Sequence, residues 1–345
     1  MFFCFLILFI PVNVFALSDT SKSSIVMDVD SGRILYQKNS HEKRLIASTT
    51  KIMTFLVAVE NMDVNKKIVV GDEVLKMYGT NTYIEVGEEI SIKDLLYGLI
   101  LRSGNDTAVV IAKNYGSEKE FVKMMNKTAK KIGMKDTTFN NPHGLDEETK
   151  NISTAYDMAL LSRYTYNKSS LYRKITNTYK YSLKTNLKSY LWYNRNKFLK
   201  EYKYAIGGKT GYTPKASKTL VSYAKKNNLT LCAVSLKDAN HYDSQKSMYE
   251  ALFNKYKRYE IISKNRFRVD QVYYKDKLYI KEDFYYPLTK NEVDNIKTVL
   301  KITKLKNYKN NSQVGEIVVN LDDEMIKKIP VYVKKKSKKK FFLLR

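Results

Sequence analysis

Three short motifs occur in order along the chain: Ser48-Thr-Thr-Lys51, Ser103-Gly-Asn105 and Lys209-Thr-Gly211. Taken singly, each motif is a weak signal. A serine followed three residues later by a lysine also occurs at three other places in this lysine-rich chain: Ser40/Lys43, Ser222/Lys225 and Ser337/Lys340. The surroundings of each serine therefore have to decide which pair is functional.

Only Ser48 lies at the start of a predicted helix. The apolar residues that follow it recur at helical spacing, at Ile52, Phe55, Leu56 and Val59. Positions three apart share one helix face, so the Lys51 amine is predicted to reach the Ser48 hydroxyl. The unpaired N–H groups of a helix N-terminus also favour negative charge that develops there. An N-cap serine with a solvated lysine is the alternative, and it is the better interpretation of the motif on its own.

The rest of the pattern predicts a large domain whose elements run β, then α, then β, then α. A β-hairpin with its turn at Gly32 comes first, and capping-box patterns at Ser91 and Ser117 begin two helices of a helical middle region. A second hairpin is predicted within residues 220–236, and a helical pattern resumes over 243–256. After about residue 262, short runs rich in Tyr, Val, Ile and Lys predict a small β domain.

Six segments, in order, resemble the low-molecular-weight penicillin-binding proteins that act as serine D-alanyl-D-alanine carboxypeptidases. The segments are 30–36, 47–54, 102–108, 141–146, 153–157 and 208–213. The resemblance implies an α+β fold of the penicillin-binding transpeptidase and β-lactamase type. That fold has an antiparallel sheet flanked by helices and a helical subdomain, and a small β domain follows it. We accordingly expect a catalytic domain over 22–260 and a β-rich domain over 263–333.

The resemblance also implies roles for the residues of the first two motifs. Ser48 would attack the carbonyl of the penultimate D-alanine of a peptidoglycan stem peptide, which expels the terminal D-alanine and leaves an acyl-enzyme. Lys51 would accept the serine proton, and this requires a lowered lysine pKa. Ser103 would relay a proton to the leaving amine, and Asn105 would bind the substrate amide.

The third motif is implied to hold the substrate. Lys209 and Thr210 would bind the terminal carboxylate, and Gly211 would allow close approach of the backbone. Backbone N–H groups of Ser48 and Tyr212 would form the oxyanion hole. β-Lactam antibiotics are implied as covalent inhibitors. The sequence has no His/Cys/Asp cluster with metal-ligand spacing, so neither a metal nor a cofactor is expected.

The chain departs from the family pattern at two places near the third motif. Ser217 and Lys218 stand where a glycine and an apolar or aromatic residue are usual, and His241 precedes Asp243 where an arginine is common. These changes bear on rate and substrate preference. His143 lies in an Asn-Pro-His-Gly segment, where it is expected to shape a loop and to have no catalytic role.

The two ends of the chain predict where the protein works. Residues 1–16 are almost wholly apolar and end in Val-Phe-Ala, which is typical of a secretory signal peptide. Export would leave an anionic surface or wall polymer, and no nucleic acid, as the partner of a chain with a net charge of +26. Residues 334–345 join six lysines to Phe-Phe-Leu-Leu, which suits adsorption to the outer face of the cytoplasmic membrane. A solvated tail is the alternative.

Two other functions compete with the carboxypeptidase hypothesis. A class A-like β-lactamase shares the three motifs, but no clear glutamate motif lies between Asn105 and Lys209, and the extra β domain is not expected of it. A non-catalytic cationic module that binds the cell wall would explain the charge and leave the ordered motifs unexplained.

Overall fold

The computed structural model describes residues 17–269, 273–274 and 277–335, and the chain divides into two compact units between Asn254 and Lys255. The predicted signal peptide, residues 1–16, and most of the predicted tail, residues 336–345, lie outside the described residues. Within the described ranges, no helix is both long and apolar enough to cross a membrane.

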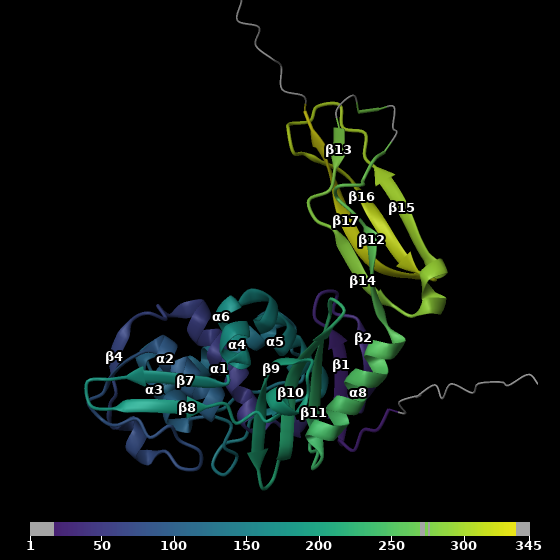
Figure 1. Cartoon of the computed structure of the whole chain (residues 1–345). Helices are drawn as coiled ribbons and strands as arrows, with labels where there is room; N and C mark the ends of the chain where they lie inside the picture. The colour runs from purple at the N-terminus through teal and green to yellow at the C-terminus, as the bar shows by residue number, and fades with distance from the viewer. Residues whose placement is uncertain (1–16, 270–272, 275–276, 336–345) are drawn as a thin grey trace, which may run out of the picture. The chain divides into compact units, whose positions relative to one another are not determined.

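The first unit is built on a five-stranded antiparallel sheet with the strand order β2-β1-β11-β10-β9 (Figure 1). Both predicted hairpins belong to it. The second one turns at Asn227 and Asn228, whose positive φ angles of 49° and 64° suit a two-residue hairpin loop. Strand β9, which carries the Lys-Thr-Gly motif, lies at an edge of the sheet. The strands are β1 (Ser23–Asp28), β2 (Ile34–Lys38), β9 (Ala205–Thr213), β10 (Ser217–Lys226) and β11 (Leu229–Leu236).

Helices cover both faces of this sheet. Neighbouring residues of a strand point to opposite faces, and in β10 each of two neighbours meets a different helix. The Ser222 hydroxyl lies 2.9 Å from the Tyr249 hydroxyl of α8 (His241–Lys255), whereas the Tyr223 hydroxyl donates to the Ser162 carbonyl of α5 (Ala155–Lys168) at 2.9 Å. The sheet is therefore the middle layer of three.

A helical region packs beside the sheet and contains the helices that the capping patterns predicted. The Ser91 and Ser117 hydroxyls accept hydrogen bonds from the third residue after each, at 3.0 and 3.2 Å. Gly133 ends α4 in a left-handed conformation with φ 94°. The helices are α1 (Lys51–Asn61), α2 (Ile92–Tyr97), α3 (Asn105–Tyr115), α4 (Glu118–Ile132), α6 (Ser170–Asn177) and α7 (Phe198–Glu201).

Three two-stranded sheets complete the first unit, and none of them was predicted from the sequence. One is the hairpin formed by β7 (Lys180–Lys184) and β8 (Ser189–Tyr193), which lies in front of α2 and α3 in Figure 1. The other two pair β3 (Arg44–Leu45) with β6 (Ile152–Ser153) and β4 (Lys67–Val69) with β5 (Glu89–Ser91).

The second unit consists of two antiparallel sheets around their own core. Ile262 and Phe284 of the smaller sheet pack on a core that contains Val319 and Val331 of the larger one. This unit begins with β12, ahead of the start that the sequence predicts at residue 263, because β12 pairs with β14. The sheets are β12 (Lys257–Ile262) with β14 (Phe284–Leu288), and β13 (Lys277–Tyr279), β17 (Glu324–Lys334), β16 (Gln313–Leu321) and β15 (Ile296–Ile302).

Candidate active site

Ser48 lies on a short 3-10 turn that leads directly into α1. The sequence predicts an α-helix from this serine, but the turn Ala47–Thr50 comes first and the α-helix begins at Lys51. The cause is local: the backbone N–H of Thr49 bonds to the Ile46 carbonyl three residues back, at 3.2 Å. Ser48 and Lys51 still lie one turn apart.

The Lys51 side chain is fully buried and contacts three oxygen atoms. Its Nζ lies 3.0 Å from Ser48 Oγ, 2.8 Å from Asn105 Oδ1 and 2.6 Å from the His143 carbonyl oxygen. Burial lowers the pKa of Lys51 well below its usual value, and the charge of Lys209 lowers it further. A neutral amine has two N–H groups for the amide and carbonyl oxygens, which leaves its lone pair for the serine hydroxyl.

Ser103 is held in a left-handed backbone conformation at the end of a π-helical turn. The turn spans Gly98–Arg102, and Ser103 follows it with φ 62° and ψ 35°. Such a conformation costs free energy for a residue with a β-carbon, and π-helical turns are frequent at functional sites. The result here is that the Ser103 hydroxyl accepts a hydrogen bond from Lys209 Nζ at 2.9 Å.

Lys209 reaches the site from the edge strand β9. It is 1% exposed, and its Nζ donates to Ser103 Oγ and, at 2.6 Å, to the Thr210 carbonyl. Burial is the main cause that lowers its pKa to about 7, and the nearby Arg195 guanidinium adds to the effect. Two buried lysines, each linked to a serine, thus meet at one place.

Asn105, which the sequence predicts to bind the substrate amide, lies in the same cluster and contacts two groups of the protein. Its Oδ1 accepts from Lys51 Nζ, and its Nδ2 donates to the Tyr78 carbonyl at 2.8 Å. The side chain is 2% exposed and does not line the cleft. Asn105 is therefore placed to hold Lys51, since both ends of its amide are engaged within the protein.

The Lys-Thr-Gly motif packs its glycine against the turn that carries Ser48. A β-carbon added to Gly211 would collide with the Thr219 hydroxyl and would lie 3.0 Å from the Ser48 nitrogen. Only glycine allows the strand to approach this closely. The next side chain, Tyr212, is 64% exposed at the rim. The approach of β9 leaves the Ser48 nitrogen facing the strand.

An open cleft of about 380 Å³ lies over these groups. The predicted residues Ser48, Ser103, Thr210, Gly211 and Tyr212 line it. The buried Lys51 and Lys209 contact Ser48 and Ser103, and the buried Asn105 contacts Lys51. Five further residues line the cleft: Thr80, Arg195, Lys218, His241 and Tyr242.

Sequence reasoning missed Arg195, and no motif surrounds it. Its backbone N–H bonds to the Leu101 carbonyl at 3.0 Å, which places an exposed guanidinium at the cleft beside Lys209. Lys218 and His241 were noted in the sequence only as departures from the family pattern. Both now prove to line the cleft, so the departures fall at the site itself.

The loop Asn141–Asp146 supplies a carbonyl instead of a side chain. The His143 carbonyl accepts from Lys51, while burial and the charge of Lys51 lower the pKa of the His143 ring to about 3. The loop is fixed by Asn141, whose Oδ1 accepts from the Gly144 nitrogen at 2.7 Å. The sequence predicts a loop here. It does not predict the contact with Lys51, because any residue type would present the same backbone carbonyl.

We expect Gly144→Ala to lower the free energy of unfolding by about 2–4 kcal/mol. Gly144 has φ 94°, and a β-carbon there would collide with the Ala47 carbonyl oxygen. Gly133→Ala is the matched control, because Gly133 also has φ 94° but has no atom within 4 Å of the added carbon. Urea denaturation measures both. Equal losses in the two variants would show that the loop is not packed on the serine turn.

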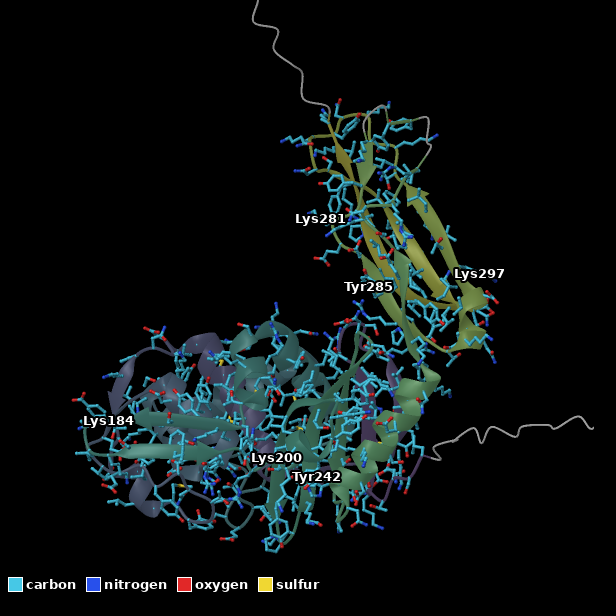
Figure 2. The ribbon with its side chains drawn as sticks, in the orientation of Figure 1. Lys184, Lys200, Tyr242, Lys281, Tyr285 and Lys297 are labelled. Carbon is cyan, nitrogen blue, oxygen red and sulfur yellow. The ribbon has the colours of Figure 1, made fainter. Side chains whose placement is uncertain are left out.

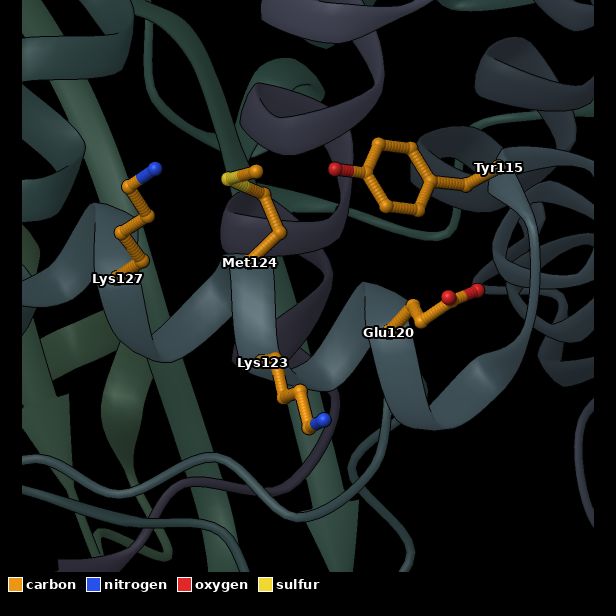
Figure 3. A pocket seen from close by; sticks show the side chains of 5 residues that line it. All are labelled: Tyr115, Glu120, Lys123, Met124 and Lys127. Carbon is orange, nitrogen blue, oxygen red and sulfur yellow. The ribbon is translucent and has the colours of Figure 1, made fainter.

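A second hollow lies on α4, away from this site. Figure 3 shows its lining, Tyr115, Glu120, Lys123, Met124 and Lys127, around a volume of about 340 Å³. It contains no serine or cysteine nucleophile, and none of the predicted site residues line it. The cleft over Ser48 is therefore the candidate active site.

Comparison with known proteins matches both units of the chain. A family profile described as D-alanyl-D-alanine carboxypeptidase matches residues 12–240, and one described as penicillin-binding protein 5, C-terminal domain, matches residues 256–339. These matches confirm the resemblance that the six segments predicted.

Individual relatives agree over nearly the whole chain. D-alanyl-D-alanine carboxypeptidase DacF of Bacillus subtilis is 34% identical, over 95% of this chain and 88% of its own length. D-alanyl-D-alanine carboxypeptidase DacD of Salmonella typhimurium is 30% identical, over 89% and 84%. The crystal structure of penicillin-binding protein 5 from Haemophilus influenzae superposes with a TM-score of 0.75 at 25% identity, over 92% of this chain and 97% of that one. The expected α+β fold with its small β domain is thereby confirmed, and the chain belongs to the D-alanyl-D-alanine carboxypeptidase family.

Proposed function

We propose that Ser48 is the nucleophile of this serine D-alanyl-D-alanine carboxypeptidase, with Lys51 as its general base. The observation that carries the proposal is the buried Lys51 amine, 3.0 Å from Ser48 Oγ and with a lowered pKa. The neutral amine takes the hydroxyl proton while Oγ bonds to the carbonyl carbon of the penultimate D-alanine. The tetrahedral intermediate then expels the terminal D-alanine as an amine, which takes up one proton.

The second serine and lysine are suited to supply that proton. Ser103 lines the cleft and accepts from Lys209, so its hydroxyl proton can pass to the leaving nitrogen while Lys209 replaces it. A water molecule then attacks the acyl-enzyme ester and gives up a proton to Ser103, which passes one on to Lys209 and so restores the charge that this lysine lost during acylation. Lys51, by returning its proton to Ser48 Oγ, regenerates the enzyme and releases the shortened stem peptide.

The substrate is proposed to lie along the edge strand β9. An edge strand presents backbone groups that no sheet neighbour occupies, and an extended peptide can pair with them. The N–H groups of Ser48 and Tyr212 are the proposed oxyanion donors, and the approach of Gly211 to the Ser48 nitrogen supports this. Removing one such donor typically costs about 10²–10³-fold in kcat.

A cationic end of the cleft is proposed to select a free carboxylate. Lys209, Thr210 and Arg195 meet there, and a bound carboxylate would favour the charged form of Lys209. We propose that Asn105 acts on Lys51 and does not bind the substrate amide directly, because its own amide is already engaged at both ends.

Release of D-alanine from a stem pentapeptide, together with labelling by fluorescent penicillin, tests the function. We expect stoichiometric labelling and steady D-alanine release. Rapid nitrocefin turnover without D-alanine release would instead indicate a β-lactamase, and no labelling at all would indicate the non-catalytic cationic module. The relatives and the family profile over residues 12–240 support the carboxypeptidase over both alternatives.

We propose further that the protein is exported and works at the outer face of the cytoplasmic membrane. Support comes from the sequence of residues 1–16 and from the lysines and apolar tip of residues 334–345. Each lysine near an anionic surface contributes about 1 kcal/mol. Deleting residues 336–345 removes four lysines and is expected to weaken binding to phosphatidylglycerol vesicles by ~10²-fold or more in a sedimentation assay. Unchanged binding would favour a solvated tail.

A further inference from the structure

One wall of the cleft carries an exposed lysine, Lys218 of β10. Residues two apart in a strand share a face, so Lys218 projects to the same side of the sheet as Ser222, the side that α8 covers. Lys218 is paired with Tyr212 of β9, and its diagonal neighbour on that strand is Thr210. Diagonal neighbours lie about 7–8 Å apart, within reach of a long side chain. The Lys218 amine can therefore reach a group that is bound at Thr210.

The first turn of α8 adds no positive charge to this wall at neutral pH. His241 is 8% exposed, and burial is the main cause that lowers the pKa of its ring below the ordinary value of 6.5. The charge of Lys218 lowers this pKa further, although Asp238 acts in the opposite direction. Tyr242, which Figure 2 labels, follows His241 in the same turn and also lines the cleft. The positive charge of this wall therefore comes from Lys218.

The residues that line the cleft do not neutralise this charge. They include the cations Lys218 and Arg195 but neither an aspartate nor a glutamate. Asp238 is fully buried, and its carboxylate accepts a hydrogen bond from the Thr20 hydroxyl at 2.6 Å. Within the described part of the chain, Lys218 Nζ donates to the Ala239 carbonyl at 3.0 Å. Because an ammonium group has three N–H donors, two of them remain for a bound anion.

The terminal carboxylate of the substrate is the anion placed to meet these donors. Its proposed contacts are Thr210 and Arg195, and the proposed oxyanion donor Tyr212 receives the carbonyl oxygen of the penultimate residue. Lys218 lies opposite Tyr212 and diagonal to Thr210, so the last residue of the substrate passes beside it. Lys209 projects to the other face of β9, because it is the neighbour of Thr210 in the strand. Lys218 and Lys209 can therefore approach the carboxylate from opposite sides.

We infer that Lys218 is a specificity-determining residue that binds the terminal carboxylate of the substrate from the α8 side of the cleft. This inference rests on the proposed function of the cleft. A hydrogen bond between an ammonium and a carboxylate is charge-assisted, so it favours a substrate with a free carboxylate over a neutral one. Lys218 stands where an apolar or aromatic residue is usual, and His241 stands where an arginine is common. The two departures thus move a positive charge of the cleft from the helix to the strand.

Two thioester substrates with the same acyl group, benzoyl-D-alanine, test this contact. The leaving group of one is thioglycolate, which carries a carboxylate, and that of the other is thioglycolamide, which is neutral. We expect Lys218→Met to lower kcat/KM for the thioglycolate ester by about 5–10-fold, and Lys218→Glu to lower it by about 20–50-fold. Both variants should hydrolyse the neutral ester within about 2-fold of the wild-type kcat/KM. Reaction of the released thiol with a chromogenic disulfide measures the rates.

Lys225→Met and Lys225→Glu are the matched controls. Lys225 is also exposed on β10, seven residues from Lys218, which at about 3.3 Å per residue is about 23 Å along the strand. Both controls should leave both substrates unaffected. Equal losses on the two esters in the Lys218 variants, no loss on either ester, or a loss in Lys218→Glu no greater than in Lys218→Met would each overturn the inference. A wild-type protein that hydrolyses neither ester and releases no D-alanine from a stem pentapeptide would overturn the proposed function instead.

Discussion

Replacing Ser48 with alanine is expected to abolish covalent labelling by penicillin and to lower D-alanine release by ~10⁴-fold or more. In the proposed mechanism the hydroxyl is the group that forms and breaks the acyl bond, and alanine leaves the cleft and the buried lysines in place. Fluorescent penicillin in a denaturing gel measures the label, and an assay for free D-alanine measures turnover. The variant should still bind a stem pentapeptide, because the proposed carboxylate contacts come from Lys209 and Thr210.

Ser40→Ala is the matched control, since Ser40 belongs to another serine and lysine pair with the same spacing. Ser40 is 4% exposed, and its hydroxyl donates a hydrogen bond to Gln37 Oε1 at 2.9 Å. No lysine amine is bonded to this hydroxyl in the described part of the chain, so Ser40 is not activated as a nucleophile. We expect full labelling of this variant. If Ser48→Ala were still labelled, another residue would be the nucleophile and the assignment of Ser48 would be wrong.

Replacing Lys51 with methionine is expected to slow acylation by penicillin by about 10³-fold, in the usual range for loss of a general base. Methionine fills similar space, so the loss reports the amine and not a cavity. Stopped-flow acylation measures the rate, and circular dichroism checks that the variant is folded. Lys43→Met is the control, because Lys43 has the same spacing from Ser40 but lies at the surface in an ion pair with Asp136.

The same amine is expected to set the acidic limb of the wild-type pH profile. The pKa of Lys51 is lowered well below its ordinary value of 10.5. When the pH falls below this lowered pKa, the amine becomes protonated and can no longer act as a base, so the acylation rate falls about tenfold per pH unit. Above that pKa the amine is neutral and this limb levels off. The Lys51→Met variant should lack the limb. An acidic limb that persists unchanged in Lys51→Met would show that Lys51 is not the base.

Much of the site could be predicted because its residues come from short, ordered motifs. Ser48 and Lys51 need only one turn of chain to meet, and the apolar spacing after them predicted the helix. The capping patterns at Ser91 and Ser117 also predicted real helices, since a cap is satisfied within four residues of chain. Lys209 was predicted only through the resemblance, because more than a hundred residues separate it from its partner Ser103.

The features that escaped prediction depend on contacts between distant parts of the chain. The His143 carbonyl is a backbone group, which any residue type would present, and Arg195 reaches the cleft because its own backbone pairs with Leu101. The motif also did not predict the contacts of the Asn105 side chain with Lys51 and with the Tyr78 carbonyl. The start of the second unit was predicted too late, because the pairing of β12 with β14 outweighed the change in composition near residue 262.

The two buried lysine amines are proposed to serve catalysis, but they lower the thermal stability of the protein. Lys51 and Lys209 are 0% and 1% exposed, and an ionisable group held in such surroundings works against folding. On the proposed mechanism, apolar residues of the same size would raise the free energy of unfolding and abolish turnover. Keeping the two lysines for activity therefore holds the melting temperature of this enzyme below the value that its fold could reach. Substitutions intended to raise its thermal stability should leave this pair unchanged and be made elsewhere in the chain.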